Sequence, residues 1–285
     1  MFSRNRSIAG KMGISIVAVS ALALLAGCSS SGESDVPTSD VPTVESIQEA
    51  GVLRVATLTA DAPWSSIGSS GDQEGFDVDL AQALADKLGV EVEFTTVDGP
   101  GRIASLQSEK VDLTIGEFSN TPERDEVIDF SIDYVLNPGA YMVLADSGIE
   151  TKEDLNDASM KACIQQGGTA TDLVPADIPN VGTLFLPGTN DCFEALNSGQ
   201  ADAMTQTTFY YLPLMDKDPG KFKILDGTYG NNHLAVGLQA GSTGLADYVN
   251  EFLKEYQDAG ELESSFNKWF GFELPATAQP DWFSN

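Results

Sequence analysis

The stretch FDVDLAQALADKLG (76–89), followed directly by VEVEFTTV (90–97), decides the fold of this chain. In the first segment apolar residues recur at helical spacing, and Gly89 is typical of a helix C-cap. The predicted buried face of this helix comprises Val78, Leu80, Ala81, Leu84 and Leu88. The second segment alternates as a strand does, and a buried strand, LRVATL (53–58), precedes both. Strand, helix and strand predict a right-handed βαβ unit, a parallel sheet and hence an α/β fold.

The first 27 residues have the pattern of an export signal. Three basic residues open the chain, and the apolar run ISIVAVSALALLA (14–26) is shorter than the roughly 20 residues that span a bilayer. The tetrad LAGC ends at Cys28 and resembles the lipobox of bacterial lipoproteins. The resemblance implies cleavage before Cys28, lipidation of that cysteine and anchoring to the outer face of the cell membrane. An ordinary signal peptide with an incidental cysteine is the alternative.

Composition limits the partners of the exported protein. Without residues 1–27, about 258 residues remain, enough for one or two compact domains with a sizeable core. Loss of three basic residues changes the formal net charge from −28 to about −31. Such an acidic surface repels nucleic acid and anionic lipid. Residues 28–44 are rich in Ser, Pro, Asp and Thr, and are predicted to form a disordered tether.

Two cysteines remain once Cys28 is assigned to lipid. In an oxidising compartment we expect Cys163 and Cys192 to form a disulfide, which would stabilise the fold by about 3–4 kcal/mol on the loop-entropy model. Two buried free thiols are the alternative. A metal site is not expected, because His233 is the single histidine and the cysteines are widely spaced.

Two decamers 90 residues apart resemble each other. They are LQSEKVDLTI from Leu106 and LNSGQADAMT from Leu196, and each runs from a helix face into a short strand. Chance similarity between helix-to-strand connections is the alternative explanation. We interpret the two decamers as equivalent strand ends of two α/β lobes, whose ligands would gather at the carboxyl ends of strands. The segments near Glu117 and Thr207 would then lie on opposite walls of a cleft.

The chain resembles the extracellular solute-binding proteins, family 3, the polar amino-acid-binding proteins of ABC importers. The resemblance covers residues 45–273. Six stretches in the family's order carry it: GVLRVAT (51–57), GFDVDLAQALADKLG (75–89), RIASLQSEKVDL (102–113), TPERDEVIDFS (121–131), QGGTATDL (166–173) and LNSGQADA (196–203). The resemblance implies two Rossmann-like α/β lobes joined by a two-strand hinge, as in type II periplasmic binding proteins. The predicted boundaries are signal peptide 1–27, tether 28–44, lobe 1 at 45–142 and 237–275, lobe 2 at 143–236, and a C-terminal tail at 276–285.

A carboxylate-binding site is predicted around Arg124. Its guanidinium presents a rigid fork that binds a carboxylate bidentately, and in the family the arginine of TPxR grips the ligand's α-carboxylate. The family's G-[ST]-T element is matched by Thr169, with Gly168 in place of a hydroxyl residue, and Ser119 matches the family's polar residue five before the arginine. Without the resemblance, the residues alone would favour a surface arginine at Arg124, and a simple helix cap is the alternative for the turn at 167–169.

Two further residues are weaker candidates. Trp64, in DAPW, matches an aromatic that the family has near a proline, and is predicted either to wall the ligand or to lie in the core. Arg102 resembles an arginine that reaches the ligand's side chain in some members, although a solvated helix face is nearly as plausible.

The chain departs from the family at two positions. Many members carry an aspartate for the α-ammonium where this chain has Thr207, and a small or neutral residue where it has Glu117. A buried unpaired carboxylate is costly. Glu117 is therefore predicted either to supply the missing negative charge to the ligand or to pair internally with Arg102. Ligand identity stays open at this point.

The resemblance implies a binding protein that captures a small polar amino acid by hinge closure and delivers it to a membrane permease with its ATPase subunit. A monomer without cofactor is expected, and no catalytic motif of the GxSxG, HExxH or P-loop type is present. The rival is an enzyme on the same scaffold, since cyclohexadienyl dehydratases resemble this family and a carboxyl in the cleft, such as Glu117, can act as a general acid.

Overall fold

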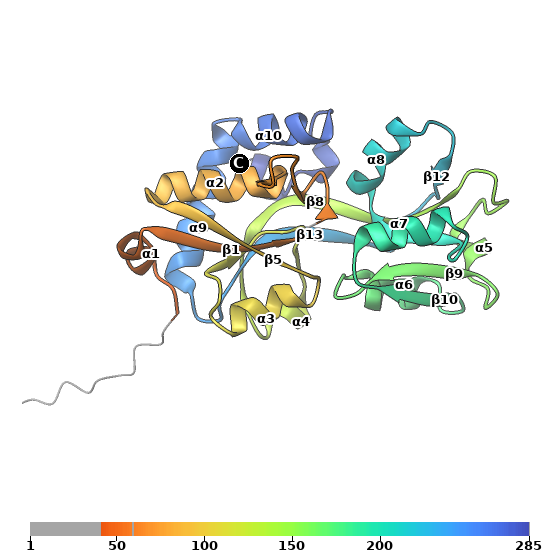
Figure 1. Cartoon of the computed structure of the whole chain (residues 1–285), viewed down its shortest axis with the longest axis horizontal. Coiled ribbons are helices and arrows are strands. Elements are labelled where there is room, and N and C mark those ends of the chain that lie inside the picture. The colour runs from red at the N-terminus through yellow and green to blue at the C-terminus, as the bar shows by residue number, and fades with distance from the viewer. Residues whose placement is uncertain (1–40, 59, 285) are drawn as a thin grey trace, which may run out of the picture. The chain divides into compact units, whose positions relative to one another are not determined.

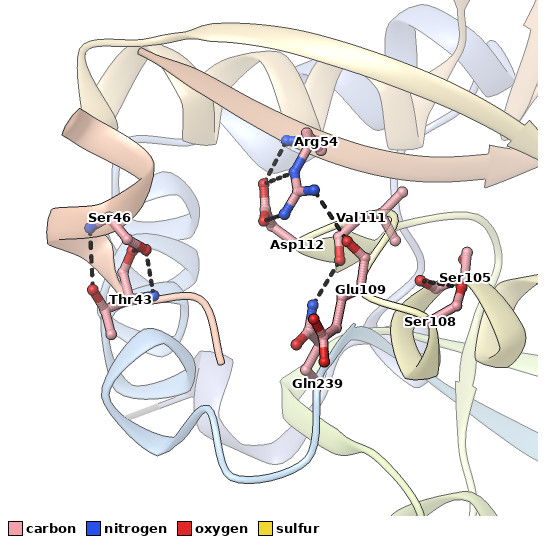
Figure 2. Close-up of polar contacts among 9 residues, drawn as sticks. All are labelled: Thr43, Ser46, Arg54, Ser105, Ser108, Glu109, Val111, Asp112 and Gln239. Atoms are coloured by element: carbon pink, nitrogen blue, oxygen red, sulfur yellow. Dashed lines mark hydrogen bonds and ion pairs between the residues drawn. The ribbon is translucent and has the colours of Figure 1, made fainter. Parts of the chain in front are cut away.

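The computed structural model describes residues 41–58 and 60–284 (Figure 1). The predicted signal peptide, Cys28 and most of the predicted tether lie outside the described residues. Helix α1 (Val44–Ala50) begins where folded structure was expected, and Gly51 ends it with φ of 71°. Its N-terminus is fixed by a capping box, in which Thr43 and Ser46 each accept the other's backbone N–H (Figure 2).

One mixed sheet carries the fold. Its strands lie in the order β10-β9-β11-β8-β13-β6-β1-β5, with β12 paired to β8 and β7 paired to β13. The bounds are β1 (Val52–Leu58), β5 (Glu91–Val97), β6 (Leu113–Thr114), β7 (Ser119–Asn120), β8 (Asp129–Leu144), β9 (Lys161–Gln165), β10 (Gly182–Leu186), β11 (Ala203–Thr207), β12 (Phe222–Ile224) and β13 (Gly230–Leu238). A small separate sheet comprises β2 (Ala60–Asp61), β3 (Ser65–Ile67) and β4 (Gln73–Glu74).

Helices cover the sheet in two groups, at either end of β8 and β13 (Figure 1). One group contains α1, α2 (Phe76–Leu88), α3 (Gly101–Gln107), α4 (Pro122–Asp125), α9 (Thr243–Asp258) and α10 (Glu261–Phe270). The other contains α5 (Lys152–Leu155), α6 (Ala170–Asp177), α7 (Thr189–Asn197) and α8 (Thr208–Lys217). Within residues 41–58 and 60–284, none of the helices has the length and apolar character needed to span a membrane.

Lobe 1 confirms the predicted βαβ unit. Strand β1 is parallel to β5 and to β6. Between β1 and β5 the chain forms the small sheet and then α2. All five apolar residues predicted for the face of α2 are buried, against α9 and α10. The Arg54 guanidinium grips the Asp112 carboxylate with N–O distances of 3.2 and 2.5 Å, and so ties β1 to the start of β6 (Figure 2).

Lobe 2 is a second, smaller α/β unit. Strand β9 pairs in parallel with β10 on one side and β11 on the other. The Cys163–Cys192 disulfide joins β9 to α7, with Cα atoms 5.4 Å apart. The disulfide prediction is therefore confirmed over the alternative of two free thiols. Cys163 and Cys192 both lie in the buried core of this lobe.

Two long strands connect the lobes, as predicted. Strands β8 and β13 pair antiparallel over most of their length. Residues 139–143 of β8 pair with β11 in lobe 2, whereas residues 237–238 of β13 pair with β6 in lobe 1. The predicted boundaries after residues 142 and 236 fall inside these shared strands and stay a prediction.

The predicted C-terminal tail packs onto lobe 1. It contains two short 3-10 helices, Ala276–Ala278 and Asp281–Ser284. Ala278 is buried in the lobe 1 core, and the Trp282 indole N–H donates to the Asp133 carbonyl at 2.8 Å. These contacts extend the folded part beyond the end predicted at residue 275.

Candidate functional site

Glu117 and Thr207, predicted on opposite walls of a cleft, are in direct contact. They follow β6 and end β11, so each stands at the carboxyl end of an equivalent strand in its lobe. The Thr207 hydroxyl donates to Glu117 Oε1 at 2.5 Å, and the Asn137 amide of β8 donates to the same oxygen at 3.1 Å. The two lobes therefore meet across a buried carboxyl group.

The backbone at Glu117 is held in an unusual conformation. Its φ of 43° lies in the left-handed region, which non-glycine residues rarely adopt. Asp77, in the first turn of α2, accepts the Glu117 N–H at 2.6 Å and the Tyr134 hydroxyl at 2.9 Å. Burial raises the pKa of Asp77 to about 7. Asp77 thus orients Glu117 without lining the cleft itself.

Arg102 is bound almost wholly by backbone carbonyls. Its guanidinium donates to the carbonyls of Gly99, Gly116 and Glu117 in lobe 1, at 2.9 to 3.1 Å, and to Gly167 in lobe 2 at 3.1 Å. It therefore reaches Glu117 through the main chain rather than through the carboxylate. Burial lowers the pKa of Arg102.

Arg124 faces the cleft beside Arg102. Its guanidinium donates to the Ser119 carbonyl at 2.7 Å and to the Gly167 carbonyl at 3.0 Å, and lies 4.8 Å from the centre of the Phe118 ring. Burial, and then the charge of Arg102, lower the pKa of Arg124 to about 9. Among the described residues, neither arginine has a carboxylate oxygen within 4 Å, so two adjacent positive charges face the cleft without a direct ion pair.

The 167–169 turn contacts Arg124, whose guanidinium donates to the Gly167 carbonyl. Gly168 and Thr169 line the same cavity as Arg124 and Ser119. Thr169 precedes α6, so its amide and that of Ala170 have no partner within the helix. The hydroxyls of Thr169 and Ser119 both donate to Asn232 Oδ1, at 2.6 and 3.2 Å.

The lobes also touch through glycine backbones. A Cβ placed on Gly99 would lie 2.1 Å from the Gln166 carbonyl oxygen, and one on Gly167 would lie 2.6 Å from the Pro100 nitrogen. Gly167 additionally has φ of 73°, which favours glycine. Glycine at positions 99 and 167 therefore allows the two lobes to approach this closely.

Three cavities lie along the interface between the lobes. The inner cavity, of about 30 Å³, is lined by seven of the eight predicted ligand residues: Arg102, Glu117, Ser119, Arg124, Gly168, Thr169 and Thr207. An outer cavity of about 440 Å³ shares Ser119, Arg124, Gly168, Thr169 and Asn232 with it. A side cavity of about 200 Å³ shares Gln165 with the inner one.

Trp64 lies apart from these cavities. Its side chain is fully buried in lobe 1, with its ring centre 4.8 Å from that of Phe270 and 5.6 Å from that of Phe76. Of the two alternatives that the sequence left open, the ligand wall and the core, the structure places Trp64 in the core. A large aromatic residue beside a proline is compatible with both places, so the motif alone could not distinguish the two alternatives.

Sequence reasoning missed several residues of the site, and three of them fix its geometry. Asn232 bridges the lobes, Asn137 donates to Glu117, and Asp77 orients Glu117. Asparagine is depleted in strands, so the two buried asparagines in β8 and β13 carried a usable signal. Asp77 gave none, because an acidic residue in the first turn of a helix is ordinary.

The donor set does not suggest a metal. Within the described part of the chain, no group of three or more His, Cys, Asp or Glu side chains is arranged to hold a metal ion. The inner cavity instead combines the guanidinium groups of Arg102 and Arg124 with the carboxyl group of Glu117, which suits a zwitterionic ligand.

Known proteins share this architecture. The L-cystine-binding protein TcyJ of Escherichia coli (strain K12) is 26% identical over 261 residues, covering 91% of this chain and 96% of TcyJ. Cyclohexadienyl dehydratase of Pseudomonas aeruginosa is 28% identical over 191 residues, covering 66% of this chain and 69% of that enzyme. The solved structure of AncCDT-1, an ancestral amino acid-binding protein and a precursor of cyclohexadienyl dehydratase, superposes with a TM-score of 0.75. The two are 31% identical, and the match covers 80% of this chain and 99% of that one.

The family model of the bacterial extracellular solute-binding proteins, family 3, matches residues 53–272, which include both lobes and the connecting strands. This range contains every residue of the inner cavity. The chain belongs to the bacterial extracellular solute-binding proteins, family 3.

Proposed function

We propose that this protein captures a small polar amino acid between its lobes and delivers it to the permease of an ABC importer. The observation that carries the proposal is the pair of guanidiniums at the cleft, Arg102 and Arg124, with no carboxylate within 4 Å among the described residues. A buried positive charge is strongly stabilised by an anionic partner. An α-carboxylate beside Ser119 and Gly168, bound by Arg124 and by the amides of Thr169 and Ala170, would supply it.

The opposite end of the inner cavity suits the α-ammonium. Glu117 and Thr207 lie there in contact, and Thr207 stands where many family members carry an aspartate. We infer that Glu117 replaces that aspartate from the other lobe. A zwitterion bridging both lobes would bind the closed form more tightly than the open form, and would therefore shift the population toward closure.

The proposed location follows from the N-terminal sequence. Cleavage before Cys28 and lipidation of that residue would hold the protein at the outer face of the cell membrane, where a monomer could meet its permease. Mass spectrometry of the protein purified from membranes, compared with a Cys28→Ala variant, tests this. A mature form that begins elsewhere or lacks acyl chains would rule out the anchor.

A thermal-shift screen of the soluble domain against the twenty amino acids tests ligand capture. At a concentration 100 times the dissociation constant, a ligand contributes about 2.7 kcal/mol, enough to raise Tm by roughly 5–10 °C. Arg124→Gln should weaken binding of any responding amino acid at least about 30-fold, because a buried charge loses its partner. Arg54→Gln is the control: it breaks the Asp112 contact and lowers Tm, but leaves affinity unchanged. Absence of any response would contradict the proposal.

Dehydratase activity is a second candidate function. It is favoured by one observation: burial, and then the neighbouring Asp61 carboxyl, raise the pKa of Glu117 well above its usual range, as a general acid requires. We expect no turnover, since capture by hinge closure needs no covalent step. Incubation of the purified protein with a cyclohexadienol that loses water to become aromatic, followed by detection of the aromatic product, decides between the two.

A further inference from the structure

The side cavity has a strongly acidic wall. Asp61 and Asp98 of lobe 1 and Asp191 of lobe 2 line it, and no lysine or arginine does so among the described residues. Gln165 lines both this cavity and the inner cavity, so the two are neighbours across a single side chain. A ligand held by Arg124 would extend from the positive end of the cleft toward this negative end.

Asp61 is the notable member of this wall. Asp98 and Asp191 each accept a backbone N–H, from Gly101 at 2.8 Å and from Gly188 at 3.0 Å. Asp61 is 1% exposed, and neither of its carboxyl oxygens meets a donor at hydrogen-bonding geometry in the described part of the chain. Ser65 pairs with Asp61 across β2 and β3 and is fully buried. Its hydroxyl also has no hydrogen-bond partner in the described part of the chain. Buried polar side chains without partners are rare, and each one needs a physical explanation.

No free cation is paired with Asp61 in the described part of the chain. The Glu117 carboxyl and the Thr189 hydroxyl act on Asp61, but that hydroxyl donates to Gln165 Oε1 at 3.1 Å, and Arg102 is the positive charge that acts on Asp61. Arg102, however, already directs its N–H groups to four backbone carbonyls. Two adjacent buried carboxyls cannot both be ionised unless a positive charge lies beside them. Asp61 and Glu117 therefore form a preformed acceptor pair for a cationic group.

We propose that Asp61, together with Glu117, recognises a positively charged side chain of the ligand, and that the ligand is a basic α-amino acid carrying an ammonium or guanidinium group. The inference rests on the proposed function, because it assumes that Arg124 holds the α-carboxylate. The α-ammonium would then lie at the inner face of Glu117, and the side-chain cation would pass Gln165 to reach Asp61. Asp61 would act as a specificity-determining residue.

Isothermal titration with ligand pairs that differ in charge rather than shape tests this. Arginine and citrulline form one such pair, and lysine and 2-aminoheptanoic acid form another. The wild-type protein should bind arginine or lysine at least about 30-fold more tightly than the neutral partner, the difference expected for a desolvated charge pair. Asp61→Asn keeps the shape of the side chain and should reduce that preference to less than about 3-fold. Asp72→Asn, an exposed residue of the same hairpin region, should retain the preference in full.

The outcomes separate this inference from the proposed function. If glutamine, cystine or another neutral amino acid binds tightly and the basic ones do not, the Asp61 subsite is wrong while amino-acid capture stands. If no amino acid binds, the proposed function itself fails. If basic amino acids bind but Asp61→Asn keeps the full preference while folding with an unchanged Tm, the cation is held elsewhere and Asp61 has no part in specificity.

Discussion

Alanine at Gly99 should weaken ligand binding without touching the ligand. Gly99 belongs to lobe 1, and its α-carbon faces the Gln166 carbonyl of lobe 2. A Cβ there would lie 2.1 Å from that oxygen and 3.2 Å from its carbon, well inside the closest approach that real side chains show. Because φ at Gly99 lies outside the left-handed region, alanine adds no backbone strain. The clash therefore exists only when the lobes are closed.

The size of the effect follows from this asymmetry. Overpacking of a well-packed contact costs typically 1–3 kcal/mol. The whole of that amount falls on the closed form, which we propose to be the form that holds ligand. A loss of 1–3 kcal/mol corresponds to affinity about 5- to 150-fold weaker. The free energy of unfolding of the open, unliganded protein should hardly change.

Titration calorimetry with the amino acid selected by the thermal-shift screen measures this loss. Gly244→Ala is the matched control, since a Cβ there has open space around it and φ is again unstrained. The reciprocal change, Gly167→Ala, brings a Cβ to 2.6 Å from Pro100 and is compared with Gly148→Ala, which has a similar φ of 78° but no neighbour within 4 Å. Wild-type affinity in both Gly99→Ala and Gly167→Ala would show that ligand binding does not require this contact.

Two further predictions concern stability. Replacing both Cys163 and Cys192 with alanine should lower the free energy of unfolding by about 3–4 kcal/mol, because the disulfide closes a loop with a sequence separation of 29. Urea unfolding measures this loss, and a loss below about 1 kcal/mol would contradict the prediction. Asp77, with its pKa raised by burial from 3.8 to about 7, is protonated in the folded protein over a range where the unfolded chain is already ionised. The free energy of unfolding should therefore fall as pH rises from about 4 to about 7, by up to roughly 4 kcal/mol from this group. Asp77→Asn should flatten that part of the urea-unfolding profile, whereas an unchanged slope would assign the pH dependence to other groups.

Local patterns predicted most of the fold. The βαβ unit follows from periodicity in 53–97, which is a property of neighbouring residues, and the helix face, both strands and the Gly89 cap are all where the pattern places them. The disulfide followed from counting cysteines in an oxidising compartment. The facing of Glu117 and Thr207 followed from an internal similarity, because equivalent strand ends in two lobes must meet if the lobes face each other.

The rest of the site depends on contacts that no local pattern encodes. Asn232 matters because two hydroxyls from separate lobes converge on its amide oxygen, and Asp61 because the pairing of β2 with β3 buries it near Glu117. The burial of Arg102 could be identified only from the folded structure. Its sequence position on α3 is equally compatible with a solvated face.

The two cleft arginines differ in how many donors they have left, and this separates their roles. A guanidinium carries five N–H groups. Arg102 makes four hydrogen bonds, all to backbone carbonyls, so it is nearly saturated and acts mainly by positioning the loops that form the cleft. Arg124 makes two, to Ser119 and Gly167, which leaves three N–H groups for a ligand. Because the Gly167 carbonyl accepts from both arginines, closure of the lobes on a ligand would fix the orientation of Arg124 when its free donors are needed. On the proposed function, the same carbonyl would couple the contact between the lobes to the geometry of the proposed carboxylate site.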